Sequence, residues 1–136
     1  MKPGPERALF DLYRGRFDAL AAPLGLRPLR ERGGGPTKAP RGGDARRAAE
    51  SAWIVDGCAP GGVLIALDER GTSIASRRLA EAVGRWRDEG VKEATFALGG
   101  ADGHSQALRN ASAEIWSFGA ATWPHMLARV MLAEQL

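Results

Sequence analysis

The chain has 136 residues, of which 44% are hydrophobic and 26% are charged, which is the balance of one soluble globular domain. Its net charge of +3 permits an anionic partner without requiring one. The only cysteine, Cys58, has no disulfide partner, and the chain shows neither a signal peptide nor a run of about 18 apolar residues. We therefore expect a cytoplasmic protein rather than a secreted or membrane-spanning one.

The first part of the chain is predicted to hold two helices, separated by a short strand and a loop. Apolar residues recur at helical spacing over Glu6–Leu20, which predicts an amphipathic helix. Leu26–Glu31 is a candidate strand, and the glycine-rich and proline-rich segment Gly33–Gly43 is a candidate loop. Asp44 is a plausible N-cap for a second helix that ends near Asp56.

Basic residues gather between positions 27 and 47, where Glu31 and Asp44 are the only acids. The basic residues of this segment are Arg27, Arg30, Arg32, Lys38, Arg41, Arg46 and Arg47. Arginine suits bidentate contacts with phosphate, so the segment is a candidate contact for nucleic acid. A solvated loop without a ligand explains the same composition equally well.

The rest of the chain alternates between apolar strands and helices. Val63–Leu67 is a continuous apolar run, typical of a strand buried on both faces of a parallel sheet. Thr72 and Ser73 are predicted to cap the next helix, which carries Ile74, Leu79, Ala82, Val83 and Trp86. A strand over Ala94–Leu98 follows. The remaining predicted elements are a helix over Ser105–Ala113, a strand over Glu114–Phe118 and a last helix from Pro124 to the end. This alternation predicts an α/β fold with a mostly parallel sheet.

Three segments that follow the predicted strands could bind a ligand, because ligands of open parallel sheets bind beyond the carboxyl ends of the strands. These segments are LDERG at Leu67–Gly71, LGGADG at Leu98–Gly103 and SFGAATWP at Ser117–Pro124. Their glycines and alanines would let the backbone approach a ligand closely. The glycines have a plainer explanation as well, which is that they only turn the chain.

Several common sites do not fit the sequence. The glycines of LGGADG lack the spacing of a dinucleotide fingerprint, and no Walker lysine follows them. His104 and His125 stand apart from cysteines and paired carboxylates, so a metal site is not expected, and Ser105 beside His104 does not make a hydrolase triad.

The last segment, Thr122–Leu136, has a wide apolar face that either belongs to the core or forms a subunit interface. Arg129 lies among these apolar residues. Since an unpartnered buried charge is costly, we expect Arg129 to be paired with an acid or directed at a ligand.

Three motifs resemble, in order and spacing, those of the RlmH family of SPOUT (α/β-knot) methyltransferases. They are LDERGTSIASRRLA at Leu67–Ala80, FALGGADG at Phe96–Gly103 and WSFGAATWPHMLARVMLAEQL at Trp116–Leu136. The resemblance spans nearly the whole chain. It implies a SPOUT-type α/β knot, with a mostly parallel sheet, helices on both faces and a C-terminal trefoil knot that builds the cofactor pocket.

The resemblance further implies S-adenosylmethionine as the cofactor and a homodimer as the working form. Methyl transfer would go to N3 of a pseudouridine in 23S ribosomal RNA, on the 70S ribosome or the large subunit. The positions that match the family's cofactor contacts are Leu67, Gly99, Phe118, Gly119, Ala120, Ala121, Thr122 and Trp123. His125 and Arg129, on the following helix, are the candidate catalytic residues, because a neutral histidine can accept a proton near pH 7.

Compared with the family pattern, the single domain expected over residues 1–136 lacks a first strand and a C-terminal tail. The tail is expected to contribute to the substrate side of the site. One alternative is therefore a non-catalytic, dimeric relative that binds RNA and S-adenosylmethionine without turnover. Another is a nucleotide-binding α/β domain of different function.

Overall fold

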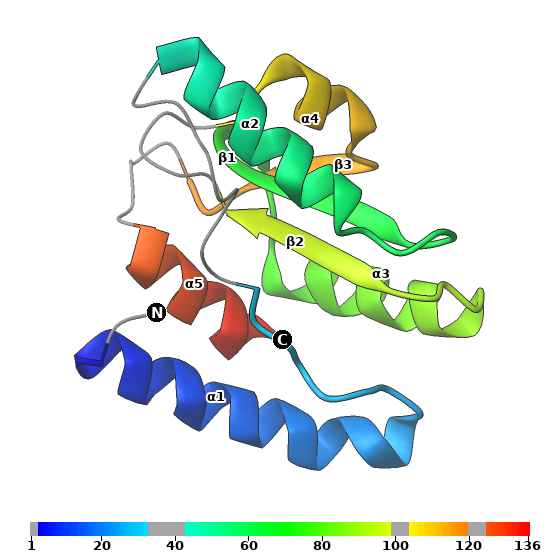
Figure 1. Ribbon diagram of the computed structural model, residues 1–136. Helices are drawn as coiled ribbons and strands as arrows, with labels where there is room; N and C mark the ends of the chain where they lie inside the picture. The colour runs from blue at the N-terminus through cyan, green and yellow to red at the C-terminus, as the bar shows by residue number, and fades with distance from the viewer. Residues whose placement is uncertain (1–2, 33–42, 99–103, 120–124) are drawn as a thin grey trace. The chain divides into compact units, whose positions relative to one another are not determined.

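The computed structural model describes residues 3–32, 43–98, 104–119 and 125–136 (Figure 1). The chain divides into two compact units, and each is described by itself. The helical unit comprises Met1–Gly33, Ala75–Glu89 and Trp123–Leu136; the sheet unit comprises Gly34–Ile74 and Gly90–Thr122. The expectation of one domain over residues 1–136 stays a prediction.

The sheet unit holds three parallel strands in the spatial order β2-β1-β3. Their bounds are β1 (Val63–Ser73), β2 (Ala94–Leu98) and β3 (Glu114–Ser117). Leu67 of β1 pairs with Leu98 on one side and with Trp116 on the other, so these three residues form a row across the sheet. The predicted parallel α/β sheet is confirmed, and the carboxyl ends of all three strands lie at one edge.

Strand β1 does not end at Leu67, as the sequence suggested, but continues to Ser73 through an irregularity. Both Leu67 and Thr72 pair with Trp116, so residues 68–71 leave the ladder with β3 and then return to it. Gly71 makes the return possible, because a Cβ added there would lie 2.7 Å from the carbonyl oxygen of Ile115. The predicted loop LDERG is therefore an excursion within a strand.

One face of the sheet packs against helices of the same unit. The buried cluster on this face comprises Leu64, Ala66, Ala97 and Leu108, with Ile54, Cys58 and Ile115 packed against it. The helices are α2 (Gly43–Asp56), close to its predicted bounds, and α4 (Gln106–Ala111), which is shorter than predicted. Asp44 lies inside the first turn of α2, so its prediction as the N-cap is wrong.

The helical unit contains α1 (Pro5–Ala21), the short 3₁₀ helix η1 (Ala22–Leu24), α3 (Ser76–Asp88) and α5 (His125–Gln135). Helices α1 and α5 lie side by side (Figure 1) and share a buried cluster of Phe10, Val130 and Ala133, with Tyr13 and Leu29 against it. The helices predicted at both ends of the chain are confirmed. None of the helices in the described ranges is both long enough and apolar enough to cross a membrane.

Two further local predictions are wrong. Leu26–Glu31 forms no strand, and the backbone N–H of Leu29 instead donates to Asp18 Oδ1 at 2.8 Å. Thr72 and Ser73 do not cap a helix, because their backbones pair with β3; helix α3 begins later, after the extended residue Ala75. In both places a tertiary contact replaces the local signal.

Candidate functional site

The described members of the predicted cofactor set lie at the carboxyl edge of the sheet. Leu67 is buried within β1, whereas Phe118 and Gly119 directly follow β3 and are half-buried. Leu98, the last residue of β2, lies in the row with Leu67 and directly precedes Gly99. The other members of the set lie outside the described residues: Gly99, Ala120, Ala121, Thr122 and Trp123.

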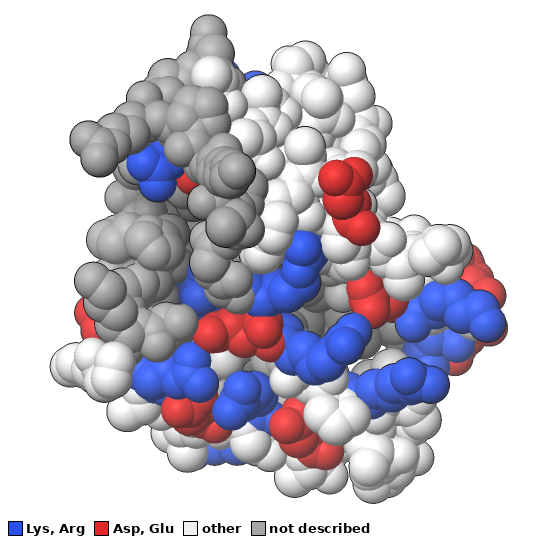
Figure 2. Space-filling view, viewed as in Figure 1, with Lys and Arg blue, Asp and Glu red and all other residues white. Residues whose placement is uncertain are grey.

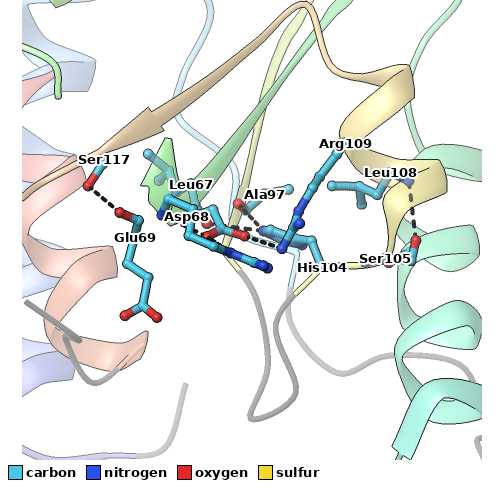
Figure 3. A network of polar contacts seen from close by, with 11 residues as sticks. Leu67, Asp68, Glu69, Ala97, His104, Ser105, Leu108, Arg109 and Ser117 are labelled. Atoms are coloured by element: carbon cyan, nitrogen blue, oxygen red, sulfur yellow. Dashed lines mark hydrogen bonds and ion pairs between the residues drawn. The ribbon is translucent and has the colours of Figure 1, made fainter. Parts of the chain in front are cut away.

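His104 joins two strands at this edge (Figure 3). Its Nε2 lies 3.1 Å from the carbonyl oxygen of Leu67 and 3.1 Å from that of Ala97. Because carbonyl oxygens only accept hydrogen bonds, Nε2 carries the proton and donates to both. The side chain is buried, with 4% of the residue exposed, so β1 and β2 are linked by a hydrogen-bonding group inside the protein.

Two serines fix the backbone next to His104. The N–H of Ser105 donates to Oγ of the buried Ser51 on α2 at 3.1 Å. Ser105 Oγ accepts a hydrogen bond from the N–H of Leu108 at 3.2 Å and so serves as the N-cap of α4. His104 thus stands directly before a capped helix; its ring is held through Nε2, and the backbone that follows it is held by Ser51.

Burial lowers the pKa of His104 below its usual value. The hydrogen bonds to the carbonyls of Ala97 and Leu67, and the negative charges of Asp68 and Glu50, act in the opposite direction without overcoming the burial. The imidazole is therefore neutral near pH 7.

This lowered pKa predicts acid sensitivity. As the pH falls below about 6.5, the unfolded chain takes up a proton at His104 before the folded chain does, so the free energy of unfolding decreases. The decrease is at most about 1.4 kcal/mol per pH unit and ends once the folded pKa is passed. Urea unfolding at several pH values should show that His104→Gln loses less stability on acidification than the wild type. If both proteins lost the same free energy of unfolding on acidification, the lowered pKa of His104 would be contradicted.

Asp68 and Arg109 form an ion pair beside His104 (Figure 3). Arg109 Nη2 lies 2.8 Å from Asp68 Oδ2, and the exposed fractions of the two side chains are 17% and 8%. The other carboxylate oxygen accepts a hydrogen bond from the N–H of Arg70 at 2.9 Å. The pair ties α4 to the β1 excursion, immediately after Leu67.

Ser117 organises the end of β3. Its buried Oγ accepts a hydrogen bond from the N–H of Gly119 at 3.0 Å and donates to the Gly119 carbonyl at 2.6 Å, with the carbonyl oxygen of Glu69 at 3.4 Å. Gly119 has a φ of +115°, which favours glycine. A Cβ added at Gly119 would meet no heavy atom within 4 Å in the described part of the chain, so a ligand could approach its backbone.

The candidate catalytic residues lie on α5, in the helical unit. His125 begins this helix, and its side chain lies outside the described residues. Arg129 Nη1 lies 3.6 Å from Glu31 Oε2, while Arg7 Nη1 lies 3.0 Å from Glu31 Oε1. The expected pairing of Arg129 with an acid is confirmed, and a catalytic role for either residue stays a prediction.

Sequence reasoning found the edge of the sheet but missed the side chains that organise it. His104 was considered only as a metal ligand or triad member, and Asp68, Arg109 and Ser117 were not singled out. A usable signal existed, since His104 and Asp68 each follow a predicted strand or its turn directly. The partner of each polar group, however, lies tens of residues away in the sequence.

Parallel strands in the order β2-β1-β3 define an α/β fold, a class whose ligands generally bind beyond the carboxyl ends of the strands. The family described as predicted SPOUT methyltransferase matches residues 1–136. The chain belongs to the SPOUT methyltransferase family. The family resemblance inferred from the three motifs is thereby confirmed, whereas the trefoil knot stays a prediction.

Similar proteins carry one name. The chain is 47% identical over 138 residues to the ribosomal RNA large subunit methyltransferase H of Nitrobacter hamburgensis. It is 48% identical to the proteins of that name from Rhodopseudomonas palustris strain BisB5 and Nitrobacter winogradskyi. In each case the match covers 100% of this chain and 84% of the relative.

Proposed function

We propose that this chain is an S-adenosylmethionine-dependent methyltransferase that acts on N3 of a pseudouridine in 23S ribosomal RNA of the large subunit. It would work in the cytoplasm as a homodimer, on the 70S ribosome or the large subunit. The observation that carries the proposal is the row Leu67, Leu98 and Trp116 across the sheet. The row brings the starts of all three expected cofactor segments to one edge. The names of the relatives support ribosomal RNA as the substrate.

The described residues fit the cofactor. Leu67 offers a buried apolar side chain, and Gly119 offers backbone at a position where an added Cβ would meet no other described residue within 4 Å. Adenine and ribose can be recognised by main-chain hydrogen bonds and apolar contact, which this edge can supply. Leu67, Gly99 and the segment Phe118–Trp123 would hold the cofactor.

The cofactor supplies a methyl group carried on a sulfonium. When N3 accepts this methyl group it must give up its proton, so the protein would have to provide an acceptor for that proton. The protein's main contribution is alignment of the two reactants. We assign His125 as the acceptor of the N3 proton, because neutral histidine is a base near pH 7, and Arg129 as a residue that faces the RNA.

The RNA contact is assigned to the basic segment between Arg27 and Arg47. Where charged side chains gather on the face seen in Figure 2, those of Lys and Arg are mixed with those of Asp and Glu. The described surface on this face therefore shows no purely basic patch. Arg46 itself lies 2.9 Å from Glu50. Lys38 and Arg41 lie outside the described residues. The excess of basic over acidic residues in this segment supports a role in binding phosphate.

Titration calorimetry with S-adenosylmethionine tests the cofactor assignment. Gly119→Ala should raise the Kd about tenfold, because an alanine at the observed φ is strained by roughly 1–3 kcal/mol and the loop would shift to relieve it. Gly84→Ala is the matched control, since Gly84 lies in helix α3 and a Cβ there would meet no described residue within 4 Å. Wild-type affinity in Gly119→Ala would contradict the assignment of this loop, and absence of binding by the wild type would contradict the cofactor.

A further inference from the structure

We propose that His104 is a positioning residue for cofactor binding, which fixes the carboxyl ends of β1 and β2 relative to each other. This inference rests on the proposed function, because it assumes that the cofactor binds at this edge. His104 would not touch the reacting atoms. It would act through the backbone of Leu67 and through the segment that begins after Ala97.

His104 bonds to both strands at the end of their described pairing. Within the described residues, Leu67 and Leu98 are the last pair between β1 and β2. The Nε2 of His104 lies 3.1 Å from the carbonyl oxygen of Leu67 and 3.1 Å from that of Ala97, so one donor joins the two strands at this last pair. Buried carbonyls require donors, and here a side chain supplies the donor.

His104 directly follows one of the expected cofactor segments, Leu98–Gly103, in the chain. Ala97 and His104 are seven residues apart, and the hydrogen bond between them joins the two ends of the intervening segment. That segment contains Gly99, an expected cofactor residue, while the other carbonyl belongs to Leu67, also an expected cofactor residue. One imidazole therefore sets the spacing between two of the three cofactor segments.

The chain around His104 is itself held by hydrogen bonds and an ion pair. Ser51 and the N-cap Ser105 fix the backbone that follows it. The Asp68–Arg109 pair anchors α4 to the β1 excursion on the neighbouring side (Figure 3). A side chain that holds other groups in place needs such support, because a mobile side chain could not keep its partners at fixed positions.

The test compares three variants of the full chain. His104→Leu keeps bulk but removes the donor, whereas His104→Gln keeps an N–H at similar reach. Gln106→Ala is the control, because the side chain of Gln106 is exposed and donates to Asn110 Oδ1 within the same helix, α4. The measurements are the Kd for S-adenosylmethionine by calorimetry, KM and kcat for methyl transfer to ribosomes, and thermal unfolding.

We expect His104→Leu to raise the Kd and KM for the cofactor about tenfold, because two buried carbonyls lose their donor and the edge relaxes. The kcat at saturating cofactor should change less than about twofold, since no reacting group is lost. His104→Gln should restore the affinity to within about threefold of the wild type, and Gln106→Ala should match the wild type. Rescue by glutamine is the result that a merely space-filling role of His104 would not give.

Wild-type cofactor affinity in a folded His104→Leu protein would overturn the inference, as would a failure of glutamine to rescue. If His104→Leu does not fold, His104→Asn replaces it, because the shorter amide cannot reach both carbonyls. Absence of cofactor binding by the wild type would overturn the proposed function and this inference together. If the wild type and His104→Leu bind S-adenosylmethionine with the same Kd, this inference is overturned and the proposed function is not.

Discussion

Gly71→Ala is expected to reduce the free energy of unfolding by about 3 kcal/mol, a large effect for one methyl group. A Cβ at this position would lie 2.7 Å from the carbonyl oxygen of Ile115, 2.8 Å from its carbonyl carbon and 2.9 Å from its Cγ2. The obstacle is mostly backbone, so no side-chain rotation can relieve it. Strand β1 would have to move away from β3 at the point where it rejoins the ladder.

Urea unfolding followed by circular dichroism measures this effect. Gly15→Ala is the matched control, because Gly15 lies in α1 and an added Cβ would meet nothing within 4 Å in the part of the chain that the structure describes. Alanine should stabilise that helix by up to about 1 kcal/mol. If Gly71→Ala were as stable as Gly15→Ala, the close return of β1 to β3 would be refuted.

Asp68→Ala is the second substitution with a large expected effect, a loss of about 3 kcal/mol. It would leave the largely buried guanidinium of Arg109 without the carboxylate at 2.8 Å, and removal of one partner of a buried pair is strongly destabilising. It would also remove the acceptor for the N–H of Arg70. Chemical denaturation of the variant measures the loss.

Asp11→Ala is the control for this substitution. Asp11 also pairs with arginines, Arg7 at 3.1 Å and Arg14 at 3.4 Å, but 43% of its side chain is exposed. Exposed pairs contribute about 0–1 kcal/mol, so this variant should remain close to the wild type. An Asp68→Ala protein no less stable than Asp11→Ala would show that the pair beside β1 contributes nothing.

The regular parts of the fold could be predicted because their signals are local. The apolar run over Ala94–Leu98 forms β2 with the predicted bounds, and the helical spacing after Glu6 forms α1. The excursion of β1 could not be predicted, because residues 68–71 are charged residues and a glycine, and they belong to a strand through the pairing of Thr72 with Trp116 and of Ser73 with Ser117. Likewise Asp18, eleven residues away, satisfies the backbone of Leu29 and removes the expected strand.

The edge of the candidate site could be predicted, but its internal connections could not. Glycines after apolar runs mark the carboxyl ends of strands, which placed Leu67 and Gly119 correctly at one edge. The hydrogen bonds that hold this edge span 37 residues for His104 and Leu67, and the Asp68–Arg109 contact spans 41. Such partners depend on strand order and register, which no local pattern specifies.

Methyl transfer by this protein is tested most directly by an assay with the full chain, S-adenosylmethionine and ribosomes whose 23S ribosomal RNA lacks the methyl group. Mass spectrometry of the 23S ribosomal RNA would locate any methyl group that is added. We predict one methyl group at N3 of a pseudouridine in the large subunit, with a higher KM for the cofactor in Gly119→Ala. Cofactor binding by the wild type without any methylation of the RNA would contradict this function and indicate a non-catalytic relative.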